Sequence, residues 1–308
     1  MMRNFTSPSF FVSLFLVLSL ASCHKFEGDQ TVPAYLRIDT MAVVCDYHTY
    51  GAATHNFTDA WVYVDDNIVG CFELPATFPV LAEGPHKVTV LPGIKVNGIA
   101  QTRSQYPFMS AVVYQDFNLV KDSIRTLTPQ FNYYPNGDNL HVRWLEDFDG
   151  GSVSLHPTST SDTTINRVSG PLAWHDPEGI HSTYSGKVVL TADSLNFCVA
   201  SGEFDDLPTK GSACMLEMDY KCSDSCLVGL YYQKDNKIVQ YPILRLRPTG
   251  ESGVEPVRWN KIYVNIGPYC VENEGADYFK IYLSSWYYRN EGNQYFYFDN
   301  LKLIFRDR

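Results

Sequence analysis

Short stretches of alternating hydrophobic and polar residues recur along the chain and predict β-strands. Residues 61–64 alternate ahead of the turn cluster Asp65-Asp66-Asn67, and residues 68–72 resume an extended pattern after it. Alternation on both sides of a short polar turn is typical of a β-hairpin. A second tight turn, at residues 83–85, leads into the strand-like residues 86–90. No segment has the spacing of a helix of ordinary length.

Further strands are predicted at residues 109–114 and 125–134. The turn formers Pro-Asn-Gly-Asp at 135–138 then interrupt the hydrophobic pattern, so we place a domain boundary there. Near the end of the chain, residues 295–298 alternate Tyr and Phe. Successive side chains of a strand point to opposite faces, so this alternation predicts a strand between two layers.

The composition is typical of globular β-domains. Hydrophobic residues make up 45% of the chain and charged residues only 19%, which argues against disorder, and the 21 Tyr and 18 Phe favour strands. The 308 residues exceed what one small core usually needs. We therefore predict an all-β protein with two β-sandwich domains, at residues 33–136 and 137–308. The net charge of -10 and the lack of a Lys/Arg run argue against a nucleic-acid partner.

The beginning of the chain has the pattern of an export signal. Arg3 precedes an apolar run over residues 10–20 that is too short to span a bilayer. The run ends in Leu20-Ala21-Ser22-Cys23, which resembles a bacterial lipobox. The resemblance implies that residues 1–22 are a lipoprotein signal peptide and that Cys23 carries lipid. An ordinary secretory signal with a chance cysteine is the alternative.

Residues 23–32 are polar and aperiodic, as a lipidated tether would be. Several acyl chains on one cysteine hold a protein stably at a membrane. We therefore expect an outer-membrane lipid anchor. The sequence leaves open whether the protein faces the periplasm or the cell surface.

Three motifs in the first domain resemble the PEGA-type β-sandwiches of bacterial envelope proteins. They are V-D-D-N at residues 64–67, G-x-F-x-x-P at 70–75 and G-x-H-x-V-x-V at 84–90, and the resemblance covers residues 60–94. It implies a small PEGA-like or immunoglobulin-like sandwich.

Three motifs in the second domain resemble the galactose-binding-like jelly rolls of carbohydrate-binding modules. They are E-D-F at residues 146–148, S-G-K-x-x-L at 185–190 and F-D-N-L-K-L at 298–303, within residues 144–304. The resemblance implies a structural Ca²⁺ held by Glu146 or Asp147 together with Asp299, since hard oxygen ligands suit that ion. Solvated acidic side chains are the alternative for these residues.

Together the two resemblances imply a cell-envelope lipoprotein of the Bacteroidetes type. We expect a non-catalytic protein that binds a glycan or another envelope component through its jelly roll. The alternative is a structural accessory subunit of an outer-membrane secretion, adhesion or surface-motility assembly. The sequence has no G-x-S-x-G, H-E-x-x-H, G-x-G-x-x-G or P-loop motif, which argues against an enzyme. A glycosidase that uses Glu146, Asp147 or Asp149 as its catalytic carboxylates is an alternative hypothesis with less support.

Aromatic residues beside turn signals are the candidates for ligand binding, because sugar rings stack on flat apolar faces. Trp174 and His175 begin a polar loop, and Trp286, Tyr287 and Tyr288 lead into a predicted hairpin turn. Packing in the core is the alternative for each of them.

Two further groups have possible chemistry. Asp46, His48 and His55 lie in one loop and have side chains that bind metals, although an ordinary polar loop is the preferred interpretation.

Seven cysteines remain besides Cys23, and Cys222 and Cys226 flank a turn-like tripeptide that a disulfide would bridge. Because seven is an odd number, at least one of these cysteines has no disulfide partner within the chain.

Overall fold

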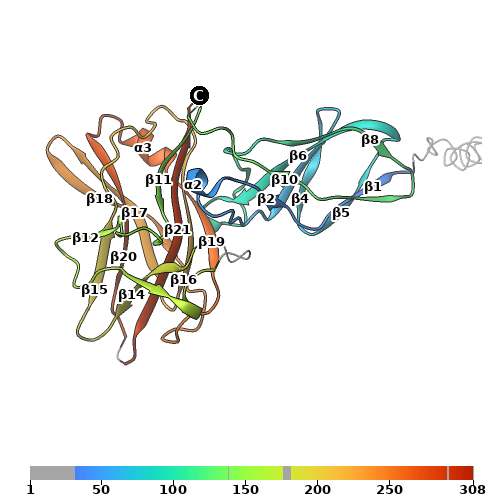
Figure 1. The fold of residues 1–308 in the computed structure, drawn as a ribbon. Coiled ribbons are helices and arrows are strands. Elements are labelled where there is room, and N and C mark those ends of the chain that lie inside the picture. The colour runs from blue at the N-terminus through green and yellow to red at the C-terminus, as the bar shows by residue number, and fades with distance from the viewer. Residues whose placement is uncertain (1–31, 138, 176–181, 290, 308) are drawn as a thin grey trace, which may run out of the picture.

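The computed structural model describes residues 32–137, 139–175, 182–289 and 291–307. Two groups of β-sheets lie end to end and give the molecule an elongated shape (Figure 1). The prediction of an all-β protein with two sandwiches is confirmed. The predicted signal peptide, the tether and Cys23 lie outside the described residues. No helix in the described ranges is both long enough and apolar enough to cross a membrane.

The first group contains a five-stranded, a three-stranded and a two-stranded sheet. Its strands are β1 (Ala34–Ile38), β2 (Ala42–Val43), β3 (Asp59–Val64), β4 (Asn67–Glu73), β5 (Ala76–Val80), β6 (Gly84–Lys95), β7 (Arg103–Gln105), β8 (Val112–Leu119), β9 (Ile124–Leu127) and β10 (Gln130–Phe131). The five-stranded sheet has the order β4-β3-β6-β7, with β8 also paired to β6. The other two are β5-β1-β9 and β10-β2.

The predicted hairpin is confirmed, because β3 and β4 pair antiparallel across the turn. Asp65 and Asp66 have φ angles of 48° and 64°. Positive φ at both central residues matches the right-handed twist of the flanking strands. The turn chemistry of the sequence therefore sets this part of the fold.

The second group forms a sandwich of a six-stranded and a five-stranded sheet. Its strands are β11 (Leu140–Glu146), β12 (His156–Pro157), β13 (Asn166–Ser169), β14 (Tyr184–Leu190), β15 (Asn196–Ala200), β16 (Cys214–Cys222), β17 (Cys226–Lys234), β18 (Lys237–Leu246), β19 (Asn260–Asn265), β20 (Tyr278–Trp286) and β21 (Gln294–Arg306). The six-stranded sheet has the order β13-β14-β21-β16-β19, with β11 also on β21. The five-stranded sheet is β12-β15-β20-β17-β18.

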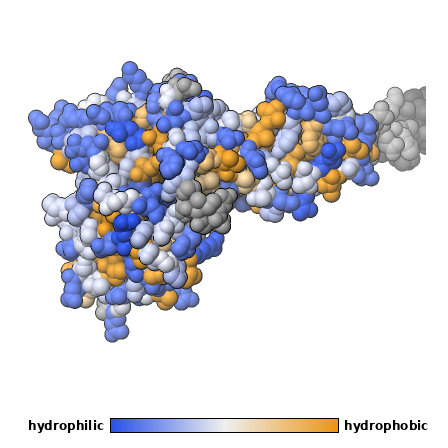
Figure 2. Space-filling model, in the orientation of Figure 1, coloured by the Kyte–Doolittle hydropathy of each residue, from blue (hydrophilic) through white to orange (hydrophobic). Residues whose placement is uncertain are grey.

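Helices are short throughout the described residues, as the sequence predicts. They are α2 (Tyr47–Tyr50), α3 (Gly267–Glu272) and the 3-10 turns η2 (Val96–Gly98) and η3 (Gly170–Leu172). On the surface, hydrophilic and hydrophobic residues are interspersed over the face shown in Figure 2.

The core of the second sandwich follows the predicted alternation of β21. Phe296 and Phe298 are fully buried between the two sheets, where both rings contact Phe197. The neighbouring Tyr297 points to the opposite face of the six-stranded sheet and is also fully buried. That outer face is therefore covered by other parts of the chain.

The first sandwich covers one end of this outer face, and the two groups share a hydrophobic core there. Met215, Tyr263 and Ile304, from β16, β19 and β21, belong to the same buried cluster as Phe57 and Phe131. The hydroxyl of Tyr263 also accepts a hydrogen bond from the backbone N–H of Asn56, at 2.9 Å. Continuous packing of this kind holds two units in a fixed arrangement.

All seven described cysteines are free thiols in this structure. Cys222 and Cys226 are both buried, but their Sγ atoms donate to different carbonyls, those of Arg247 and Leu227. The bridge that the sequence allows between them is therefore not formed. Cys222 ends β16 in one sheet and Cys226 begins β17 in the other, and both thiols lie in the core between the sheets.

Candidate functional site

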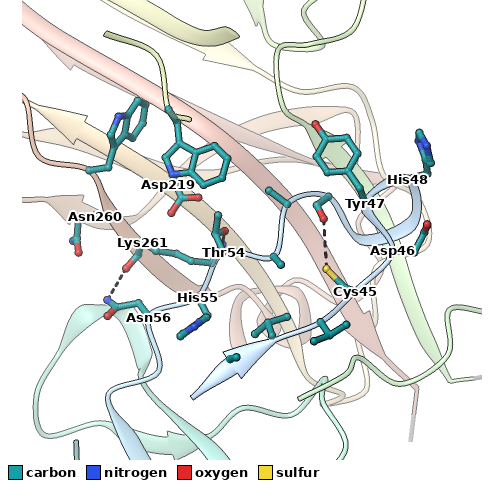
Figure 3. A pocket seen from close by; sticks show the side chains of 18 of the residues that line it. Cys45, Asp46, Tyr47, His48, Thr54, His55, Asn56, Asp219, Asn260 and Lys261 are labelled. Carbon is teal, nitrogen blue, oxygen red and sulfur yellow. Dashed lines mark hydrogen bonds between the residues drawn. The ribbon is translucent and has the colours of Figure 1, made fainter. Parts of the chain in front are cut away.

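A cavity of about 970 Å³ lies where the two sandwiches meet (Figure 3). One wall is the segment that links β2 to β3, and the opposite wall comes from the six-stranded sheet and the loop before β19. The described residues that line it are Ala42, Val43, Val44, Cys45, Asp46, Tyr47, His48, Gly51, Ala52, Ala53, Thr54, His55, Asn56, Trp174, Asp219, Arg258, Trp259, Asn260 and Lys261.

The segment between β2 and β3 keeps its shape through local hydrogen bonds. Asp46 caps α2, because its Oδ2 accepts from the backbone N–H and the hydroxyl of Thr49, at 2.8 and 2.7 Å. These bonds hold the pKa of Asp46 below its usual value. Gly51 ends the helix with a φ of 71°, a conformation that favours glycine. The wall is thus fixed before any ligand arrives.

A buried cluster of charges supports the floor of the cavity. Glu217 is fully buried, and its carboxylate lies 3.2 Å from the ammonium of Lys261 and 3.6 Å from that of Lys302. Burial alone would raise the pKa of Glu217, but the two lysines outweigh it and the pKa is lowered. The Lys261 Nζ also donates to the hydroxyl of Thr54 at 2.7 Å. The cluster therefore ties the floor to the opposite wall.

Asp219 lies beside this cluster and faces Thr54 and Lys261 (Figure 3). Its Oδ2 accepts a hydrogen bond from the Asn300 side chain at 2.9 Å. Burial raises its pKa above the ordinary value.

Two half-buried tryptophans, Trp174 and Trp259, line the same cavity. The backbone N–H of Trp174 donates to the Ser185 hydroxyl at 2.7 Å, which ties its loop to β14. The Trp259 ring meets the Tyr297 ring at an interplanar angle of 73° and also contacts the Lys221 ammonium, 5.0 Å from its centroid. The Trp259 ring and the Trp174 backbone are therefore tied to the six-stranded sheet, while both side chains stay partly accessible.

Histidine also contributes to the cavity lining. His55 stacks on Phe57 with ring centroids 4.9 Å apart, and burial with the nearby Lys261 lowers its pKa. Asp46, His48 and His55, the loop residues considered as metal ligands, all line the cavity. Within the described ranges, however, no group of three or more Asp, Glu, His or Cys side chains is placed to hold a metal ion.

Of the five aromatic and histidine residues predicted to bind ligand, only Trp174 lines the cavity. His175 contacts the carbonyl of Gly170 through its Nε2 at 2.8 Å. Trp286 and Tyr288 are 53% and 60% exposed at the end of β20 and in the loop after it. The Tyr288 hydroxyl donates to Asp224, and that of Tyr287 to the Gly292 carbonyl.

The three predicted calcium ligands are engaged with protein donors. Glu146 accepts from the Phe148 N–H and from Ser154, Asp147 from the Tyr47 hydroxyl, and Asp299 from the Ser185 hydroxyl and the Asn300 N–H.

Their carboxylate oxygens are of the type that calcium prefers. The pKa of Asp299 is raised well above its usual value by burial, and the nearby Asp219 and Asp149 add to the shift. A bound cation would relieve this repulsion. As placed, however, these carboxylates do not form a group that could hold a metal. Calcium binding stays a prediction.

Sequence reasoning missed Trp259, Asp219 and Lys261. Trp259 lies between Arg258 and Asn260, so its polar neighbours gave the same signal that singled out Trp174. Asp219 and Lys261 occupy polar positions of strands, and only the pairing of β16 with β19 brings them opposite each other.

No protein-family model and no curated protein matches the chain. Among solved structures it is similar to a carbohydrate-binding module of the β-sandwich superfamily, with 11% identity and a TM-score of 0.38 over 80% of this chain and 84% of that chain. It is also similar to the family 11 carbohydrate-binding module of the Clostridium thermocellum cellulase Lic26A-Cel5E, with 14% identity and a TM-score of 0.35 over 56% and 98%. A tandem of two family 22 modules from Paenibacillus barcinonensis Xyn10C gives 14% identity and a TM-score of 0.36 over 80% and 73%.

Proposed function

We propose that this protein is a non-catalytic glycan-binding lipoprotein of the outer membrane, anchored through Cys23. The observation that carries the binding function is the pair Trp174 and Trp259 in one cavity with charged and amide side chains. Flat aromatic faces stack on the C–H faces of sugar rings, while amides, carboxylates and cations hydrogen-bond the hydroxyls. A cavity of about 970 Å³ has room for a short oligosaccharide.

The fixed walls of the cavity support this function. The shared core, the α2 cap and the Glu217 cluster hold the lining residues in place without a ligand. Binding then costs little ordering of the protein, which favours affinity for a flexible, strongly hydrated ligand such as a glycan.

Binding without hydrolysis is favoured by the roles of the acidic residues in the lining. Asp46 caps a helix, and Asp219 accepts a hydrogen bond from Asn300. Both carboxylates therefore already stabilise the fold. A glycosidase needs two carboxyl groups at a set separation across the scissile bond.

A glycan array followed by calorimetry tests the proposal. Trp174→Ala and Trp259→Ala should each reduce the free energy of binding to the best array ligand by about 2 kcal/mol or more, as for a buried aromatic at a binding hot spot. Trp286→Ala is the matched control, since Trp286 is exposed and outside the cavity lining, and it should bind like the parent. Near-UV circular dichroism checks that all three variants are folded.

The results of these experiments distinguish the candidate sites and functions. Loss of binding in Trp286→Ala alone would move the site to the end of β20. The hairpin turn predicted there does not form, because β20 and β21 belong to different sheets. Failure to bind any glycan, together with copurification of envelope proteins, would favour the accessory-subunit role. Shortened oligosaccharides after incubation would contradict binding without hydrolysis.

A further inference from the structure

A second cavity of about 790 Å³ adjoins the first. The two share Asn56, Arg258, Asn260 and Lys261 in their linings. From these shared residues the second cavity extends between two walls. One wall is η2 and the loop after it, and the other is the end of β18. The two cavities therefore adjoin at these four residues, and we refer to the pair as the joined cleft.

The lining of the second cavity is strongly basic. It contains the five cations Lys95, Arg245, Arg247, Arg258 and Lys261 and, among the described residues, no Asp or Glu. The whole chain, in contrast, has a net charge of -10. A concave site lined by charges of one sign concentrates ligands of the opposite sign.

Two of these cations are neutralised by carboxylates, and three are not. Lys95 pairs with Glu73 at 2.9 Å, and Lys261 pairs with Glu217 at 3.2 Å. In the described part of the chain, Arg245, Arg247 and Arg258 form no ion pair with a carboxylate, and all three are exposed. Arg245 donates to the hydroxyl of Ser225 at 3.3 Å. No carboxylate competes with a ligand for any of the three guanidinium groups in the described structure.

The strand geometry presents two of these arginines on the same side. Arg245 and Arg247 flank Leu246, which is 1% exposed and belongs to the core of the second sandwich. Since side chains alternate along an extended chain, both arginines point away from that core. The backbone here is fixed because the N–H of Thr249 donates to the Cys222 carbonyl at 2.9 Å.

We propose that the joined cleft binds an anionic glycan, with sugar rings against Trp174 and Trp259 and carboxylate or sulfate groups against Arg245, Arg247 and Arg258. The proposal rests on the glycan-binding function above and adds the charge of the ligand. Guanidinium groups pair with planar carboxylates and with sulfates through two parallel hydrogen bonds. Arg258, adjacent to Trp259 and shared by both cavities, joins the stacking and the charged parts of the cleft.

Matched ligands that differ only in charge test the proposal on the full-length protein. One arm compares oligogalacturonate with its methyl ester, and the other compares a sulfated galactan oligosaccharide with its desulfated form. The anionic member of at least one pair should bind at least tenfold more tightly. The arm that shows the difference identifies the charged group as carboxylate or sulfate.

Charge-removing variants then assign the effect to the arginines. Arg247→Gln and Arg258→Gln should each weaken binding of the anionic ligand about tenfold more than binding of its neutral partner, and should reduce the salt dependence of binding. Lys237→Gln is the matched control, since Lys237 is exposed at the other end of β18 and outside both cavities. It should behave like the parent.

The binding results distinguish a wrong assignment of ligand charge from a wrong assignment of glycan binding. If charged and neutral partners bind equally and the tryptophan variants still lose binding, the cleft binds glycans without selecting charge and the inference is wrong. If no carbohydrate binds at all, the glycan function is also wrong. Binding of a single-stranded oligonucleotide as tight as that of the glycan, lost in the arginine variants, would overturn the assignment to glycans.

Discussion

Replacing Glu217 by Gln should strongly destabilise the protein. The substitution keeps the size of the side chain but removes the only carboxylate within 4 Å of Lys261 and Lys302 in the described structure. These two lysines are 6% and 2% exposed, so both ammonium groups would stay in the interior without a carboxylate within 4 Å. The hydroxyl of Tyr106, which donates to Glu217, would lose its charged acceptor.

The expected loss is about 3–5 kcal/mol in the free energy of unfolding, the usual cost of removing one partner from a buried ion pair. Urea unfolding of the full chain measures it. Lys280→Gln is the control, because Lys280 pairs with Glu203 at 3.0 Å, where the two side chains are 29% and 56% exposed. Loss of this surface pair should cost less than about 1 kcal/mol.

The loss should also depend on pH. Burial already lowers the pKa of Lys302, and removal of Glu217 lowers it further. The unfolded chain keeps Lys302 protonated up to its ordinary pKa of 10.5, so it binds more protons at this residue than the folded variant does in the alkaline range below that value. The Lys302 contribution to the stability of the variant therefore rises with pH relative to the parent, and the deficit of the variant should narrow. A loss below about 1 kcal/mol, or a deficit that does not change with pH, would refute this account of the cluster.

Three further changes test other parts of the structure. Cys23→Ser should release the chain from membranes or leave an unprocessed precursor, which fractionation and N-terminal sequencing detect, and a processed but membrane-bound variant would contradict the lipid anchor. Millimolar calcium should raise the Tm of the parent but not of Asp299→Asn, and an unchanged Tm in both would remove the calcium site while leaving the fold intact. Gly229→Ala should cost about 1–3 kcal/mol in chemical unfolding, because its Cβ would collide with the Tyr241 carbonyl and the Tyr282 ring, whereas Gly202→Ala, with open space around it, should stay within about 0.5 kcal/mol of the parent.

Features of the fold that depend on neighbours in sequence were predictable. The hairpin at Asp65 and Asp66 follows from turn residues between two alternating stretches, and the buried Phe296 and Phe298 follow from the period of β21. The prediction of one strand over residues 125–134 was only partly right. The chain forms β9 and then β10 there, interrupted at Pro129, which has no backbone N–H to continue a ladder.

The site was harder to predict because it depends on residues far apart in the sequence. Trp174 and Trp259 come from different loops, and they line one cavity because each loop leads into a strand of the six-stranded sheet. Glu217 and Lys261 are buried charges, which the pattern of a strand does not distinguish from solvent-facing ones. The sequence identified Trp174 by its polar neighbours and Asp46, His48 and His55 by their side-chain chemistry, but it did not bring the two groups together in one cavity.

The participation of Met215, Tyr263 and Ile304 in the core of the first sandwich has a consequence for the modularity of this chain. Grafting the second sandwich alone onto another scaffold would expose these three side chains to water and bring the Glu217 cluster to the surface. Exchange of the first sandwich for an unrelated one would also remove the wall formed by residues 42–56. The cavity is therefore a product of the pair, and only transfer of both sandwiches together would preserve it.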